Sequence, residues 1–234
     1  MDKTQQFQKT TGLSDTIYRY RAIWGNLITF CGFGVVWLDP NANVTIPRLV
    51  AGGLIGTAGF MLRIWASGYQ WHNIARPSPD ARTGLITAGP YAYLRHPIYL
   101  GMLLLTVGVF LAFGSWLAAI LVLIPTFMLN LWQANYEQAF LIDKFGDEAR
   151  RYCAQVPRFW PKVWAPYAIR NGTFSLTQGL KYDIGPLSAF VCFIVALSAV
   201  TLYRPPTLPV VLLVLVGSVI LSFGLVWLVR RAFK

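Results

Sequence analysis

An arginine and a histidine lie side by side at the start of a long apolar run. The segment from Gly89 to Gly101 reads GPYAYLRHPIYLG and contains Arg95, His96 and three tyrosines. Pro97 cannot continue a helix but suits the first turn of one, so we expect His96 at or just before a helix N-terminus. The unpaired N–H groups and positive end of such a helix favour an anionic ligand, for example a carboxylate. The alternative is that the two residues only anchor a helix end among lipid headgroups.

A single carboxylate follows the next long apolar run. Glu137, Leu141 and Phe145 recur at intervals of four residues and therefore share one face of a helix, which Gly146 is expected to end or bend. A carboxylate on an apolar face at a membrane boundary needs a cationic partner. That partner is either the positive group of a ligand or a basic residue of the chain, such as Arg95.

The composition is that of a membrane protein. The 234 residues are 56% hydrophobic and only 12% charged, whereas soluble domains carry about 25% charged residues. The net charge of +11 does not indicate nucleic acid as a partner, because the basic residues lie in loops that flank apolar runs; a membrane surface fits them better. The three cysteines lie far apart and there are only two histidines, so we expect no metal site.

Six apolar runs predict the fold. They lie at 23–38, 47–68, 98–114, 116–135, 185–203 and 208–229. A helix needs about 17–25 such residues to span a bilayer, so we predict an all-α, polytopic membrane protein with about six transmembrane helices. Lys and Arg gather in both termini and both long loops (69–97 and 136–184), whereas the other side has only Arg48 and Arg204. Basic loops stay cytoplasmic, so both termini are expected in the cytosol. The polar N-terminus has no signal-peptide core.

The second run contains small residues and one charge. Gly52 and Gly56 have the spacing that allows two membrane helices to pack closely. Arg63 lies on the same run. Its side chain either extends to the interface or lines a polar cavity.

The combined motifs resemble a known group of enzymes. The string GPYAYLRHPIYLG, followed by E-x-x-x-L-x-x-x-F-G and VPRFWP, resembles the isoprenylcysteine carboxyl methyltransferases and the broader phospholipid methyltransferase superfamily of integral membrane enzymes. The segment LRIWASGY, from Leu62 to Tyr69, is similar to a segment of bacterial members.

The resemblance implies S-adenosyl-L-methionine as methyl donor, bound in a cytosolic pocket under the membrane helices. The cofactor positions that it implies are Thr83, Gly84, Leu85, Ile86, Tyr91, His96, Pro97, Ile98, Tyr99 and Glu137. Glu137, His96 and Arg95 are the implied catalytic residues. Arg63 and Gln133 are expected to contact the acceptor.

Two positions depart from the pattern. The family has a pair of glutamates where this chain has Glu137 and Gln138. An arginine that handles prenylcysteine substrates is replaced here by Gln133. The first departure leaves cofactor binding intact, and the second argues against recognition of a prenylcysteine carboxylate.

The sequence therefore predicts a membrane enzyme that O-methylates a carboxylate on a lipophilic or prenylated acceptor entering from the bilayer. It is expected in the inner (cytoplasmic) membrane of a bacterium, with its active site facing the cytosol. We expect a cytosolic segment over 1–22, a methyltransferase core over 23–161 and an extension with two more spans over 162–234. Three alternatives stay open: N-methylation of a phospholipid or other lipid amine, an NADPH-dependent sterol-type reductase, and a non-catalytic lipid-binding or transport protein.

Overall fold

The computed structural model describes residues 16, 18, 20–74, 84–164 and 166–184, together with 216, 217, 220, 224, 227 and 231. Over this part of the chain the secondary structure is helical and contains no strand, as predicted. The elements are α2 (Arg21–Leu38), α3 (Ile46–Ile74), the 3-10 helix η2 (Gly89–Ala92), α4 (Pro97–Phe113) and α5 (Trp116–Gln155), followed by a short helix over 176–184. The expected span at 185–203 and most of the one at 208–229 lie outside the described residues.

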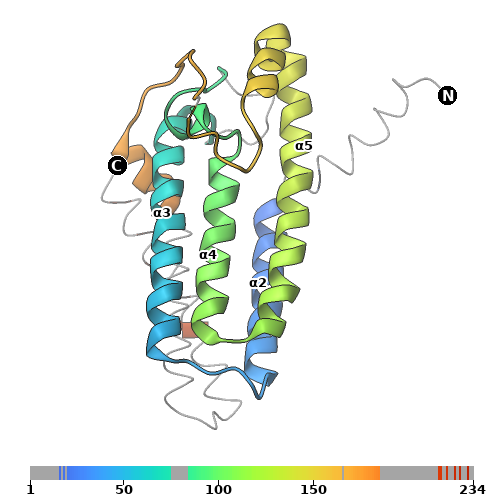
Figure 1. Ribbon diagram of the computed structural model, residues 1–234, viewed down its shortest axis with the longest axis vertical. Helices are drawn as coiled ribbons and strands as arrows, with labels where there is room; N and C mark the ends of the chain where they lie inside the picture. The colour runs from blue at the N-terminus through green and yellow to red at the C-terminus, as the bar shows by residue number, and fades with distance from the viewer. Residues whose placement is uncertain are drawn as a thin grey trace, which may run out of the picture.

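The four long helices stand side by side and run alternately up and down (Figure 1). At one end the chain passes from α2 to α3 and, through Gly114 and Ser115, from α4 to α5. Gly114 adopts the left-handed conformation and Ser115 caps α5 by accepting a hydrogen bond from the backbone N–H of Ala118, so α4 and α5 form a tight hairpin. The loops with the GPYAYLRHP and VPRFWP segments lie at the other end (Figure 1).

Among the described residues, two helices are long and apolar enough to cross a membrane. They are Ile46–Trp71 within α3 and Trp116–Gln155, and the apolar helices Leu27–Leu38 and Pro97–Phe113 are shorter. Large apolar side chains such as Leu54, Met61 and Ile124 are exposed, as lipid-facing side chains are in membrane proteins. These features agree with a helical membrane protein, and the count of six spans stays a prediction.

Helix α5 extends well beyond the predicted run of 116–135. Its 40 residues correspond to about 60 Å at 1.5 Å per residue, twice the roughly 30 Å of a hydrocarbon core. Gly146 interrupts the helix with φ 52° and ψ −126°, a conformation that favours glycine. The predicted bend at Gly146 is therefore confirmed, and Glu137 lies in the straight part before it.

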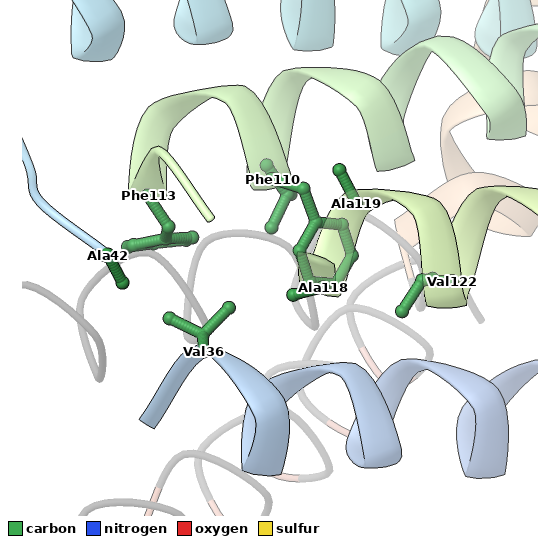
Figure 2. Close-up of a cluster of buried hydrophobic side chains, with 8 residues drawn as sticks. Val36, Ala42, Phe110, Phe113, Ala118, Ala119 and Val122 are labelled. Atoms are coloured by element: carbon green, nitrogen blue, oxygen red, sulfur yellow. The ribbon is translucent and has the colours of Figure 1, made fainter. Parts of the chain in front are cut away.

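A hydrophobic cluster joins α2, α4 and α5 near the end of the bundle where α2 connects to α3 and α4 to α5 (Figure 2). Phe110 of α4 packs between Val36 of α2 and Val122 of α5, and Phe113 and Ala118 extend the cluster toward the hairpin. This packing fixes the position of α5 relative to α4, and these two helices carry most of the side chains of the candidate site.

Glycines bring α3 and α4 into close contact. A Cβ atom added at Gly52 would lie 2.3 Å from the carbonyl oxygen of Gly108, and one at Gly59 would lie 2.7 Å from that of Gly101. Real Cβ contacts are never this short, so only glycine permits the observed spacing of the two helices. The predicted close packing along this face of the second run is confirmed.

Replacing Gly52 by Val is expected to destabilise the protein by about 1–3 kcal/mol, because the added carbons force the two helices apart. Thermal unfolding in detergent measures the loss as a lower melting temperature. Gly53→Val is the matched control, since a Cβ at Gly53 meets no atom within 4 Å. Equal melting temperatures for the two variants would contradict the packing described here.

Candidate active site

The Glu137 carboxylate is the centre of a polar cluster built from three parts of the chain. Its Oε1 accepts hydrogen bonds from the hydroxyl of Tyr99 on α4, at 2.8 Å, and from the hydroxyl of Tyr18 in the N-terminal segment, at 2.9 Å. Its Oε2 lies 3.8 Å from Nδ1 of His96. The carboxylate is buried, at 9% exposure. Two phenolic donors thus stabilise a carboxylate that solvent scarcely reaches, and an imidazole faces its other oxygen.

His96 occupies the position expected from the sequence. It is the N-cap of α4, with Pro97 as the first helical residue, and it is buried. Its ring stacks on Tyr99, with centroids 5.4 Å apart, and packs at a tilt against Phe159, at 5.9 Å. The two aromatic rings therefore fix the imidazole so that Nδ1 faces Glu137. The 3.8 Å separation is too long for a direct hydrogen bond.

Arg95 pairs with Gln138 rather than with Glu137. Its Nη1 donates a hydrogen bond to Oε1 of Gln138, so the ion pair with Glu137 considered above is replaced by a bond to a neutral amide. Its Nε is buried and has no hydrogen-bond partner among the described residues. Because an amide does not neutralise a guanidinium group, positive charge remains next to the N-terminus of α4.

Backbone hydrogen bonds join the two motif segments. The N–H groups of Arg95 and His96 donate to the carbonyl oxygens of Pro157 and Arg158, at 2.8 and 3.2 Å. Further along, Lys162 N–H donates to the carbonyl of Tyr93. The VPRFWP segment therefore lies directly against the LRHP segment, and this contact places Phe159 on His96.

Hydrogen bonds join the predicted cofactor segment, which precedes η2, to the loop that contains Asn171. The backbone carbonyl of Asn171 accepts a hydrogen bond from the backbone N–H of Thr87, and its side-chain amide donates one to the carbonyl of Leu85. Leu85 packs in a core cluster with Ala92 and Tyr152, whereas Gly84 and Ile86 are half-buried. Thr83 lies outside the described residues.

The other predicted cofactor positions lie on η2 and the first turn of α4. Tyr91 and Pro97 are buried and Ile98 is half-buried. The carbonyl of Tyr91 accepts a hydrogen bond from the hydroxyl of Tyr152 at 2.7 Å. This contact joins η2 to the far end of α5 and holds the loop over the helix ends.

The two predicted acceptor-binding residues occupy different places. Gln133 is buried on α5, one helical turn before Glu137. Arg63 makes a buried ion pair with Asp183 of the helix over 176–184, with Nε 2.8 Å from Oδ1, and its Nη1 approaches the sulfur of Met102. The structure thus brings Glu137, His96, Tyr99 and Gln133 together, while the guanidinium of Arg63 bonds to Asp183.

Tyr18, Phe159 and Asp183 were not predicted. No spacing pattern links Tyr18 to residues 119 positions away. Asp183 did carry a signal, since it is one of only nine acidic residues and lies at the start of an apolar run. Over the described residues, no three His, Cys, Asp or Glu side chains gather as a metal site would require.

Comparison with known proteins finds a family that matches the central part of the chain. Residues 48–148 match the family described as phospholipid methyltransferase. This range contains α3 without its first two residues, all of α4, the polar cluster except Tyr18 and Phe159, and α5 as far as the bend. The predicted resemblance to the integral membrane methyltransferases is therefore confirmed over the central part of the chain.

A particular relative is the protein-S-isoprenylcysteine O-methyltransferase of Schizosaccharomyces pombe. The two chains are 33% identical over 84 residues, which make up 34% of this chain and 34% of the relative. The match thus spans about one third of the curated relative. No solved structure matches the chain.

Proposed function

We propose that this protein transfers a methyl group from S-adenosyl-L-methionine to the carboxylate of a lipophilic acceptor. The observation that carries the proposal is the cluster of buried Glu137 and His96 with half-buried Tyr99, beside Arg95, whose guanidinium bonds to the neutral amide of Gln138. It lies at the helix ends of the segment that resembles membrane methyltransferases. The cluster offers a negative and a positive group at the membrane boundary, as a zwitterionic ligand requires.

The residues present fit the proposed methyl donor. Arg95 has a buried Nε without a hydrogen-bond partner among the described residues, and the adjacent N-terminus of α4 adds a positive dipole. Together they suit the carboxylate in the methionine part of the donor. Glu137 suits its ammonium group or the ribose hydroxyls, and the aromatic faces of Tyr99 and Tyr91 suit the adenine or the sulfonium.

S-adenosylmethionine, held by Arg95 and Glu137, would supply an electrophilic methyl group on a positively charged sulfur. A carboxylate is ionised at neutral pH and needs no general base. Arg95, His96 and Glu137 therefore act by binding and orientation, and the burial of His96 and Glu137 excludes water from the reacting pair.

The arrangement of charge and apolar surface supports entry of the two substrates from different sides. Arg95, Arg158 and Lys162 lie in the contacting loop segments at the end that carries the site, whereas Arg48 contacts Gly114 in the α4–α5 connection at the opposite end. Such a bias favours the cytosol for the site, with the donor arriving from there. The acceptor arrives sideways from the bilayer, which we propose to be a bacterial inner membrane.

A second acceptor chemistry has its own support. The matched family is described as phospholipid methyltransferase, whose name indicates a lipid substrate other than the prenylcysteine of the yeast relative's name. N-methylation of an amine needs a general base, and His96 opposite Glu137 is placed to take the proton. The chemical identity of the product separates the two reactions.

Thermal unfolding of the detergent-solubilised protein tests the proposal. S-adenosylhomocysteine is expected to raise the melting temperature, because a ligand that binds only the folded state stabilises it, whereas NADPH is expected to leave it unchanged. Radiolabelled methyl transfer into a total lipid extract then identifies the product. Stabilisation by NADPH alone would favour a reductase and refute a methyltransferase.

Tyr18→Phe is expected to weaken S-adenosylhomocysteine binding about 3- to 10-fold, because Glu137 keeps its charge and the hydrogen bond from Tyr99 but is oriented less firmly. Tyr18 donates one of the two hydrogen bonds to Oε1 of Glu137. Isothermal titration measures the effect, with Tyr20→Phe as control because Tyr20 is exposed. An unchanged affinity in Tyr18→Phe would remove the N-terminal segment from the site.

A further inference from the structure

Buried polar side chains continue along α5 from Glu137 into the apolar part of the helix. Thr126, Asn130, Gln133 and Glu137 are 7%, 6%, 4% and 9% exposed. Their intervals of four, three and four residues place them on one face, over about 16 Å of helix. Apolar side chains, among them Ile124 and Met128, are exposed on the same stretch.

This distribution is the reverse of a soluble helix, since the polar residues lie inside and the apolar ones outside. Polar residues within a membrane helix are costly and usually face a substrate path or cavity. Between Trp116 and Tyr136 the sequence contains no charged residue. The face that leads from Glu137 into the bilayer therefore offers neutral hydrogen-bonding groups only.

Asn130 gives the second, independent observation. Its Nδ2 is buried and has no hydrogen-bond partner among the described residues. A buried amide left without a partner opposes folding, because the group loses its hydrogen bonds to water. A ligand that brings an oxygen atom to Asn130 compensates for that loss.

We propose that Asn130 and Gln133 form a subsite for an uncharged oxygen of the acceptor, such as the carbonyl of an amide or ester, located between the methylated carboxylate and the hydrocarbon tail. The subsite rests on the proposed function, whose donor lies at Glu137 one turn beyond Gln133. It defines the substrate class as a lipid with two polar groups, one ionised and one neutral. A simple fatty or isoprenoid acid has only the ionised group.

Two acceptors of equal chain length test the subsite. N-palmitoylglycine has an amide carbonyl close to its carboxylate, and nonadecanoic acid has the same number of chain atoms without that amide. The full-length protein in detergent is expected to methylate N-palmitoylglycine about 3- to 10-fold more efficiently, measured as kcat/KM, which is the value of one neutral hydrogen bond. A protein that shows no preference, or takes neither acid, overturns the subsite.

Asn130→Leu supplies the matched variant, because Leu has nearly the same shape without the amide. It is expected to abolish the preference for N-palmitoylglycine while the melting temperature stays equal or rises, since an unpaired buried group has been removed. Asn135→Leu, on the exposed side of the same helix, is expected to keep the preference. A falling melting temperature in Asn130→Leu with the preference intact assigns Asn130 to the packing of the bundle and refutes the proposal.

The two proposals fail in distinguishable ways. Stabilisation by S-adenosylhomocysteine does not depend on Asn130, so it is expected in wild type and in Asn130→Leu alike. If that stabilisation persists and the amide preference is absent, the subsite is wrong and the methyltransferase assignment stands. If S-adenosylhomocysteine stabilises neither protein, the assignment itself fails and the subsite with it.

Discussion

Glu137→Gln is expected to lower the affinity for S-adenosylhomocysteine about 10- to 100-fold. The substitution removes the negative charge but keeps the size of the side chain and an oxygen that can accept from Tyr18 and Tyr99. Hydrogen bonds to charged groups contribute about 1.5–3 kcal/mol, and each 1.4 kcal/mol corresponds to a factor of ten. Isothermal titration of the detergent-solubilised protein measures the change, and methyl transfer is expected to fall in parallel.

Glu148→Gln is the matched control for this variant. Glu148 lies on the same helix beyond the bend and is exposed, so the same chemical change there is expected to leave binding unaltered. His96→Ala is expected to weaken binding as well, since the imidazole both faces Glu137 and stacks on Tyr99. Wild-type affinity in Glu137→Gln and His96→Ala, with unchanged melting temperatures, would show that the ligand binds elsewhere.

Asp183→Leu is expected to reduce the free energy of unfolding by about 3–5 kcal/mol, because it leaves the guanidinium of Arg63 buried without its counter-ion. The two side chains are 1% and 11% exposed. They connect α3 with the helix over 176–184, which lies beyond the segment that matches the methyltransferase family. Chemical denaturation in detergent measures the loss.

The double variant Arg63→Met/Asp183→Leu separates charge from packing. Replacing both members of a buried pair by apolar residues of similar volume is often neutral or stabilising, so most of the lost stability is expected to return. Asp143→Leu, at an exposed position of α5, is the control for the substitution itself. If the two single losses simply add in the double variant, the residues contribute separately and the ion pair is unimportant.

Local sequence rules predicted the parts of the site that depend on short-range geometry. Pro97 determined where α4 begins and hence placed His96 at its N-cap. The four-residue interval from Glu137 to Phe145 and the glycine after it predicted a shared face of α5 and its bend. These features follow from steric limits on the backbone, which act within a few residues.

The partners of the charged groups were not predictable in the same way. Tyr18 reaches Glu137 across 119 positions, and Asp183 reaches Arg63 across 120; no local rule constrains such pairs. Nor did the sequence indicate that Arg95 bonds to Gln138 while Glu137 faces His96. Adjacent residues on a helix point in different directions, and only the placement of α4 against α5 decides which of them each basic group meets.

The backbone contacts between the LRHP and VPRFWP segments have a consequence for biosynthesis. Arg95 and His96 depend on the carbonyl oxygens of Pro157 and Arg158, which leave the ribosome about sixty residues later. Helices α3 and α4 can enter the membrane during that interval, but the peptide groups in front of α4 have no acceptors from this segment until residue 158 has been made. The nascent chain is therefore expected to acquire its ligand-binding face only after the helices beneath it are already in place.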